Sequence, residues 1–123
     1  TEMMIGNIRF TDERGTPVFG GLYVRQDATT EYIEPGTFTI TPTDHWTSDY
    51  SGVEYPVAWE IAVDGEYFGQ DEMFVIQVEA MMHDQELHTS PTYWEGAVTV
   101  TGHKTGVGYA ELTGYVDAMD GFF

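Results

Sequence analysis

The residues best suited to chemistry lie near the end of the chain, where tyrosines and glutamates occupy alternate positions. Two stretches, 93–101 and 107–116, have the valine, threonine and tyrosine content of strands, and a glycine-bounded turn at 102–106 joins them into a predicted hairpin. Because side chains alternate along a strand, one face of this hairpin collects a polar and aromatic set. Its members are Tyr93, Glu95, Tyr109, Glu111, Thr113 and Tyr115.

Two carboxylates in a poorly hydrated site push one pKa upward, and the protonated group can then protonate an alkene. Aromatic faces nearby would stabilise the resulting cation. We therefore take Glu95 and Glu111 as candidate catalytic residues, and the three tyrosines with Thr113 as candidate ligand-binding residues. The alternative is that this face is simply the wet side of a sheet, with tyrosines paired across strands.

A symmetric turn would place Ala97 opposite Glu111 and Glu95 opposite Thr113, so that the two glutamates are diagonal neighbours. The other face of the hairpin is apolar, with Trp94 and Val98 on its first strand, and is expected to be core.

The segment 83–88 is a second candidate, because His83, Asp84, Glu86 and His88 place possible metal ligands at short spacing. The spacing matches no established ligand signature, so we predict no metal and no cofactor. The alternative is a polar turn in which Asp84 bonds to backbone amides.

The tryptophans form a third group. Trp59 and Trp94 lie on apolar strand faces, which favours core packing, although Trp59 could also line a pocket. Trp46 lies in a predicted loop at 43–52, where it could cover a pocket mouth, and we include it with Trp59 among the candidate ligand-binding residues.

Further strands are predicted at 4–10, 18–25 and 37–41, around Tyr32, from Pro56 to Val63, and at 73–82. In the last of these, apolar residues lie on both faces with Gln77 and Glu79 as the exceptions, which predicts cover on both sides for much of the strand. A polar turn separates the first two strands at 11–16. No window has a helical period. The pattern predicts a single antiparallel all-β domain over residues 1–123, a barrel or sandwich.

The chain has 123 residues, no cysteine and a net charge of −17, from 21 acidic against four basic residues. This charge disfavours nucleic acid and anionic membranes as partners. No apolar run is long enough for a membrane span and no signal peptide is visible, so the localisation stays open. The acidic composition is compatible with a halophilic cytoplasm or with simple solubility.

Three motifs carry a family resemblance. These are HWTSDYSGVEYPVAWEI, HDQEL, and YWEGAVTVTG followed by GVGYAELTGY. In this order they resemble the second domain of the carotenoid 1,2-hydratase (hydroxyneurosporene synthase)-like family of lipocalin-like proteins. The resemblance implies an antiparallel lipocalin-like (calycin-type) β-barrel or half-barrel.

The resemblance also implies a function and a partner. It favours binding of an apolar, isoprenoid-like small molecule, in a protein that hydrates or cyclises an alkene. The alternative is a non-catalytic structural or interaction domain. Family members carry two such domains, so we expect either a missing first domain or a second copy of this chain, in a homodimer, as the partner.

Overall fold

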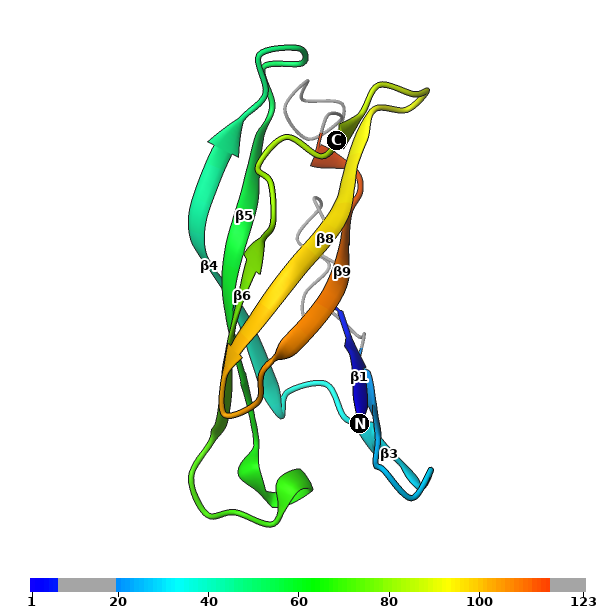
Figure 1. The fold of residues 1–123 in the computed structure, drawn as a ribbon, viewed down its shortest axis with the longest axis vertical. Coiled ribbons are helices and arrows are strands. Elements are labelled where there is room, and N and C mark those ends of the chain that lie inside the picture. Colours follow the sequence, from blue (N-terminus) through cyan, green and yellow to red (C-terminus); the bar gives the residue numbers. More distant parts are fainter. Residues whose placement is uncertain (7–19, 116–123) are drawn as a thin grey trace. The chain divides into compact units, whose positions relative to one another are not determined.

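The computed structural model describes residues 1–6 and 20–115 (Figure 1). Nine strands and one short 3-10 helix, η1 (Gly65–Phe68), make up its regular structure in this part of the chain. The strands are β1 (Glu2–Ile5), β2 (Gly21–Val24), β3 (Thr30–Ile33), β4 (Phe38–Thr47), β5 (Glu54–Val63), β6 (Phe74–Ala80), β7 (Glu86–Leu87), β8 (Tyr93–Gly102) and β9 (Gly106–Leu112). The predicted fold class, an antiparallel all-β chain of lipocalin-like type, is confirmed.

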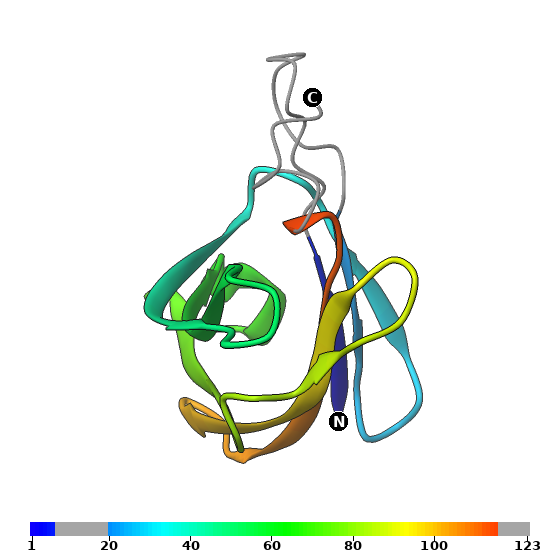
Figure 2. The same ribbon diagram turned by 90° about the horizontal axis from the view of Figure 1, so that it is seen from above.

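The first three strands form one antiparallel sheet in the order β1-β2-β3, and they lie side by side in Figures 1 and 2. Met4 pairs with Leu22, and Leu22 pairs with Tyr32. The strands predicted at 4–10 and 18–25 are therefore present in their described parts, while the turn predicted at 11–16 lies outside the described residues.

The second sheet has the order β4-β5-β6-β8-β7, and β9 pairs with β8. Both β6 and β7 pair with β8, but at different places: Val78 lies opposite Val100, and Glu86 lies opposite Trp94. The β8–β9 pairing gives the predicted hairpin, drawn yellow to orange in Figure 1.

The contacts between residues divide the chain into two compact units. Unit 1 comprises Thr1–Ile40 and Ile61–Val75, and unit 2 comprises Thr41–Glu60 and Ile76–Phe123. The single domain expected from the sequence stays a prediction.

Unit 1 is held together by aromatic contacts around η1. The Phe68 ring stacks on Phe74 at 3.9 Å and contacts Tyr23 at 4.7 Å. The Tyr67 hydroxyl accepts a hydrogen bond from the Glu34 backbone N–H, which ties η1 to the end of β3. The Asp64 side chain caps η1 by accepting from the Glu66 backbone N–H.

Unit 2 contains most of the buried apolar side chains. Tyr55, Val57 and Trp59 of β5 are buried, as are Trp94 and Val98 of β8. Trp59 and Trp94 meet edge to face with ring centroids 6.4 Å apart, an arrangement that aromatic pairs prefer. Core packing of these two tryptophans, the favoured interpretation of the sequence, is what the structure has.

Two predicted elements differ in the structure. β4 continues to Thr47, so residues 43–47 are strand and not loop, and Trp46 lies on that strand. Most of β4 is exposed, which explains why it lacks the apolar alternation that marks a strand in a sequence. β6 is buried on one face only: Gln77 and Glu79 are exposed, so the cover predicted on both sides was wrong.

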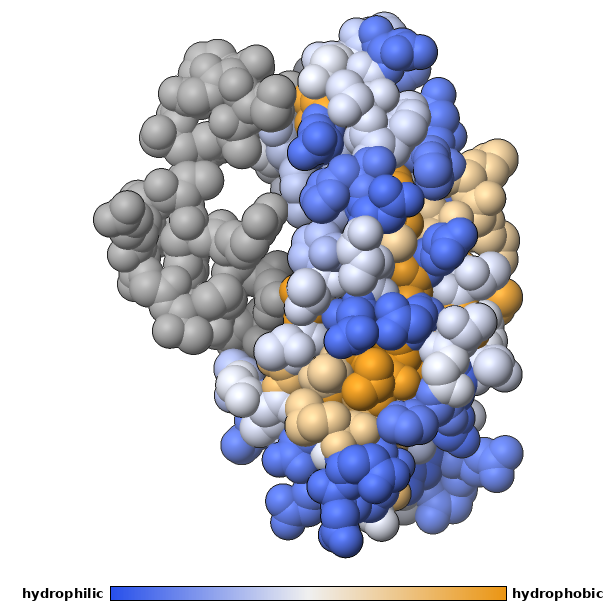
Figure 3. Space-filling view, turned by 90° about the vertical axis from the view of Figure 1, so that its left-hand side faces the viewer, coloured by the Kyte–Doolittle hydropathy of each residue, from blue (hydrophilic) through white to orange (hydrophobic). Residues whose placement is uncertain are grey.

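The acidic composition is visible on the surface. Figure 3 shows hydrophilic residues over much of the face in view, interrupted by smaller apolar areas. Among the described residues, no helix is long and apolar enough to cross a membrane.

Candidate functional site

Four residues of the predicted polar and aromatic face come together on the β8–β9 hairpin. Glu95 lies directly opposite Glu111, and Ala97 lies opposite Tyr109. The shared face was predicted correctly, but the register was wrong by two residues. Gly102 adopts a positive φ of 110°, and the turn is centred on His103 instead of Lys104. Because a two-residue slip preserves alternation, the composition of each face is unchanged.

Glu95 is the centre of this group, which we call the Tyr/Glu face (Tyr93, Glu95, Tyr109 and Glu111). The Tyr93 hydroxyl donates to Glu95 Oε1 at 2.6 Å. This hydrogen bond and partial burial raise the pKa of Tyr93 to about 12. Partial loss of water around the phenol, together with the nearby Glu95 and Glu111 carboxylates, also raises the pKa of Tyr109. Both phenols thus stay protonated, and the Tyr93 hydroxyl points at the carboxylate.

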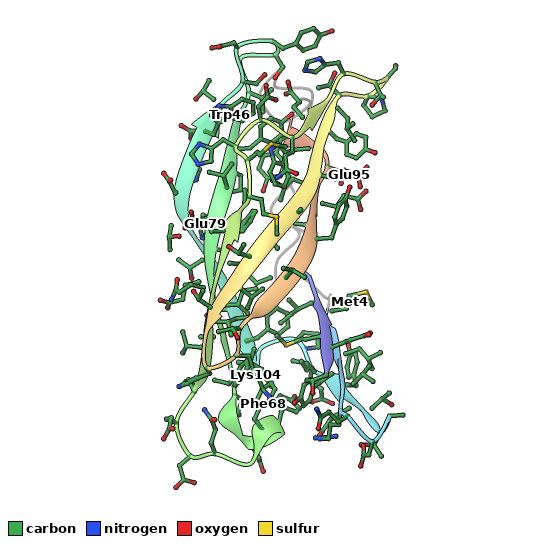
Figure 4. The ribbon with its side chains drawn as sticks, viewed as in Figure 1. Met4, Trp46, Phe68, Glu79, Glu95 and Lys104 are labelled. Carbon is green, nitrogen blue, oxygen red and sulfur yellow. The ribbon has the colours of Figure 1, made fainter. Side chains whose placement is uncertain are left out.

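The Tyr/Glu face lies on the side of β8 opposite the core, since Glu95 alternates with buried Trp94. In Figure 4, Glu95 and Trp46 lie on opposite sides of β8. Tyr93 and Glu95 are half-buried, whereas Tyr109 is 68% exposed and neighbouring Val107 is 77% exposed. The face therefore combines a hydrogen-bonded carboxylate with apolar surface that the described residues leave open.

The other predicted ligand-binding residues are spread more widely. Thr113 follows the end of β9 and is exposed. Tyr115 packs its ring on Tyr55, 5.7 Å between centroids. Trp46 is half-buried and stacks on the same Tyr55, with ring centroids 6.3 Å apart. Trp59 is in the core.

The strongest polar cluster in unit 2 is one that sequence reasoning left unassigned. The Glu86 side chain is fully buried, and it accepts four hydrogen bonds. Ser48 Oγ (2.6 Å) and His88 Nε2 (3.1 Å) bond to its Oε1, while Ser51 Oγ (2.5 Å) and Tyr55 OH (2.7 Å) bond to its Oε2. We call this group the Glu86 cluster.

Opposing influences act on the Glu86 carboxylate. Burial, the largest, raises its pKa, but the hydrogen bonds from Ser48, Ser51, Tyr55 and His88 together hold it below the usual value. The pKa of Tyr55 is raised, first by burial and then by its bond to Glu86. The cluster is thus an ionised carboxylate with a full set of donors, which is the form in which a buried charge is tolerated.

Next to it, Gln85 joins the segment before β7 to β8. Its amide nitrogen donates to the carbonyl oxygens of Met82 (2.9 Å) and Ala97 (3.1 Å), and its amide oxygen accepts from the Ala97 N–H at 2.9 Å. The sequence predicted backbone bonds in this turn but assigned them to Asp84, which is exposed. Within the described part of the chain, no group of three or more histidine and acidic side chains is placed to hold a metal ion.

The three motifs quoted above therefore meet in unit 2. The first supplies Ser48, Ser51 and Tyr55, the second supplies Gln85 and Glu86, and the third supplies Trp94, whose indole N–H donates to the His83 carbonyl at 2.8 Å. Their presence in order was visible in the sequence. The contact of the first two motifs at Glu86 was not, because the partners are 31 to 38 residues away along the chain.

Comparison with known proteins identifies the fold. A family model described as AttH-like matches residues 1–115. The crystal structure of a protein assigned as AttH from Nitrosomonas europaea resembles this chain with a TM-score of 0.72 and 30% sequence identity, over 89% of this chain and 33% of that one. The chain thus spans about a third of that protein. No curated protein matches this chain. Since the family match covers nearly all of it, the chain belongs to the AttH-like family, which is lipocalin-like.

Proposed function

We propose that the Tyr/Glu face forms one wall of a binding site for an apolar, isoprenoid-like small molecule, and that a partner domain supplies the other wall. The observation that carries this is the hydrogen bond from the Tyr93 hydroxyl to Glu95, opposite Glu111, on a face that also exposes Tyr109 and Val107. Two facing carboxylates do not suit a core face, and the half-buried hydrogen bond between Tyr93 and Glu95 distinguishes this face from a fully wet one.

The length of the AttH relative supports the partner. This chain matches a third of that protein, so a relative with this fold contains further chain that can cover such a face. A covered face would lose water around Glu95 and Glu111, which lie directly opposite each other. Two desolvated carboxylates at this spacing favour sharing a proton.

A proton shared by Glu95 and Glu111 would allow the site to catalyse the protonation of an alkene. Glu95 would transfer it to the terminal carbon of an alkene, leaving a tertiary carbocation that the rings of Tyr93 and Tyr109 stabilise. Water, or a second double bond of the same molecule, would then attack the cation, and the proton that this step releases would return to Glu95. The net reaction is a hydration or a cyclisation, and it needs no cofactor.

The substitution Glu95→Gln tests the binding site. It keeps the shape of the side chain but removes the negative charge, and it replaces one carboxylate oxygen by an amide NH2 donor, so the Tyr93 hydroxyl has at most a neutral acceptor. We expect Nile red, a neutral apolar probe, to bind at least about threefold more weakly, because Tyr93 loses its anionic partner and the face reorganises. Fluorescence titration measures the affinity, and a thermal melt checks that folding is intact.

Glu79→Gln is the matched control, since Glu79 is an exposed glutamate of the neighbouring strand β6. It should leave probe affinity and melting temperature unchanged. Equal probe binding by wild type and Glu95→Gln would contradict the proposed site, and with it the proposed reaction.

A second function is favoured by a different observation. Val107 and Tyr109 are among the most exposed large apolar side chains of the described residues. A face of this kind also suits a non-catalytic domain that packs on a second copy of the chain or on another lipocalin-like domain.

A further inference from the structure

The Glu86 cluster joins two segments that are far apart in the sequence. Ser48 and Ser51 belong to the loop between β4 and β5, while Glu86 begins β7. Both serine hydroxyls donate to the Glu86 carboxylate, one to each oxygen. Among the described residues, Glu86 is the side chain that bonds to both serines.

The same two serines also organise their own loop. Ser48 Oγ accepts from the backbone N–H groups of Tyr50 and Ser51, each at 3.1 Å, and Ser51 Oγ accepts from the Val53 N–H at 3.3 Å. The acceptor capacity of each hydroxyl is therefore engaged, and its proton is directed at the carboxylate. The orientation of loop 48–53 depends on Glu86 remaining an acceptor.

We propose that Glu86 is a pH-sensitive latch, whose ionised carboxylate holds loop 48–53 against β7 and whose protonation releases that loop. A protonated carboxyl group has an O–H that must itself find an acceptor. The four groups around it are already donors to it, so at least one of their hydrogen bonds has to break or reverse. The serines are the partners that carry the loop.

The direction of the effect follows from the groups that contact the carboxylate. The titratable ones are Tyr55 from β5 and His88, which follows β7. Tyr55 stays protonated because its pKa is raised. His88 Nε2 contacts the carboxylate as a donor, so this contact favours the ionised form of Glu86. Only protonation of Glu86 opens it, and its lowered pKa places the opening at acidic pH.

Opening of the Glu86 latch would change an exposed part of the surface. Tyr50, in the loop, stacks its ring on His88 with centroids 3.6 Å apart, and its side chain is exposed. Release of the loop would separate these rings. Asp49 in the same loop is exposed, and it is not among the hydrogen-bond partners of the Glu86 carboxylate.

Backbone amide NMR tests the latch across a pH titration. In the wild type we expect the signals of Tyr50, Ser51 and Val53 to move together, with one midpoint below about 4.3, the ordinary value for a glutamate. In Glu86→Gln these signals should be displaced already at neutral pH and show no such midpoint. Glu79→Gln, the exposed control, should titrate like the wild type.

A second variant keeps the test decisive if Glu86→Gln does not fold. Ser51→Ala removes one donor and leaves the carboxylate, so the midpoint should rise by at least about half a pH unit, because a bond to a charged acceptor favours its ionised form. Loop signals that stay fixed in the wild type until the whole protein unfolds would overturn the latch. An unchanged midpoint in Ser51→Ala would overturn it as well.

Discussion

At the scale of single residues, Gly96 shows how the YWEG motif serves the fold. A Cβ added at Gly96 would lie 2.1 Å from the side-chain amide of Gln85, which the two backbone atoms of Ala97 hold in place. The glycine is therefore required by a neighbouring side chain and not by its own backbone conformation.

We expect Gly96→Ala to destabilise the protein by about 1–3 kcal/mol, the usual cost of overpacking a well-filled site. Urea unfolding followed by tryptophan fluorescence measures this. Gly106→Ala on the same hairpin is the control, since a Cβ there meets nothing within 4 Å, and its effect should stay within about 0.5 kcal/mol. Adding Gln85→Ala to Gly96→Ala should recover part of the loss. Full additivity of the two changes would show that the clash is not the cause.

The candidate site could be predicted from the sequence only where alternation governs it. Alternation placed Tyr93, Glu95, Tyr109 and Glu111 on one face, and the structure has them there. Alternation gave no indication that Glu86 is buried, because a single glutamate in a polar stretch has the same sequence pattern as an exposed glutamate. The partners that make its burial tolerable come from another loop and from β5.

At the scale of elements, strands with a clear apolar alternation were predicted, and features that depend on contacts between strands were not. The hairpin was evident from β-branched residues around a glycine turn. Its register depends on which residue lies at the centre of the turn, and the structure has a positive φ at Gly102 and a turn centred on His103. β4 was predicted too short, since an exposed strand next to a buried one carries no apolar period. Two-residue β7 lies below the length at which any pattern is detectable.

The hairpin is also the element that tests the packing function. If a second copy covers the Tyr/Glu face, Val107→Lys places a charge in that contact and removes apolar area. Sedimentation equilibrium should then show a dissociation constant raised about tenfold or more, because burying a valine is worth roughly 1.5–3 kcal/mol. Thr43→Lys, which adds the same charge at an exposed position of β4, should have little effect. A wild type that stays monomeric at all concentrations would exclude the second copy as the occupant.

At the scale of the whole molecule, the pattern of short strands was enough to predict the fold class but not the reaction. Short strands without a helical period indicate an all-β chain, and the AttH-like match agrees. A fold of this kind hosts many functions, so the reaction depends on the Tyr/Glu face and on what covers it.

The net charge of −17 gives the final prediction, which concerns the chain as a whole. With 21 acidic and four basic residues, the folded state suffers self-repulsion that the expanded unfolded chain partly relieves. Salt shortens the screening distance from about 30 Å at 0.01 M to about 10 Å at 0.1 M.

We therefore expect the melting temperature at pH 7 to rise with sodium chloride, most steeply below about 0.1 M, where this screening distance changes most. Differential scanning calorimetry across the series measures it. Sucrose at matched osmolality is the control for solvent exclusion, which strengthens folding without screening charge. A melting temperature that is flat below about 0.1 M and rises only at molar salt would show that exclusion, and not repulsion between carboxylates, governs the response.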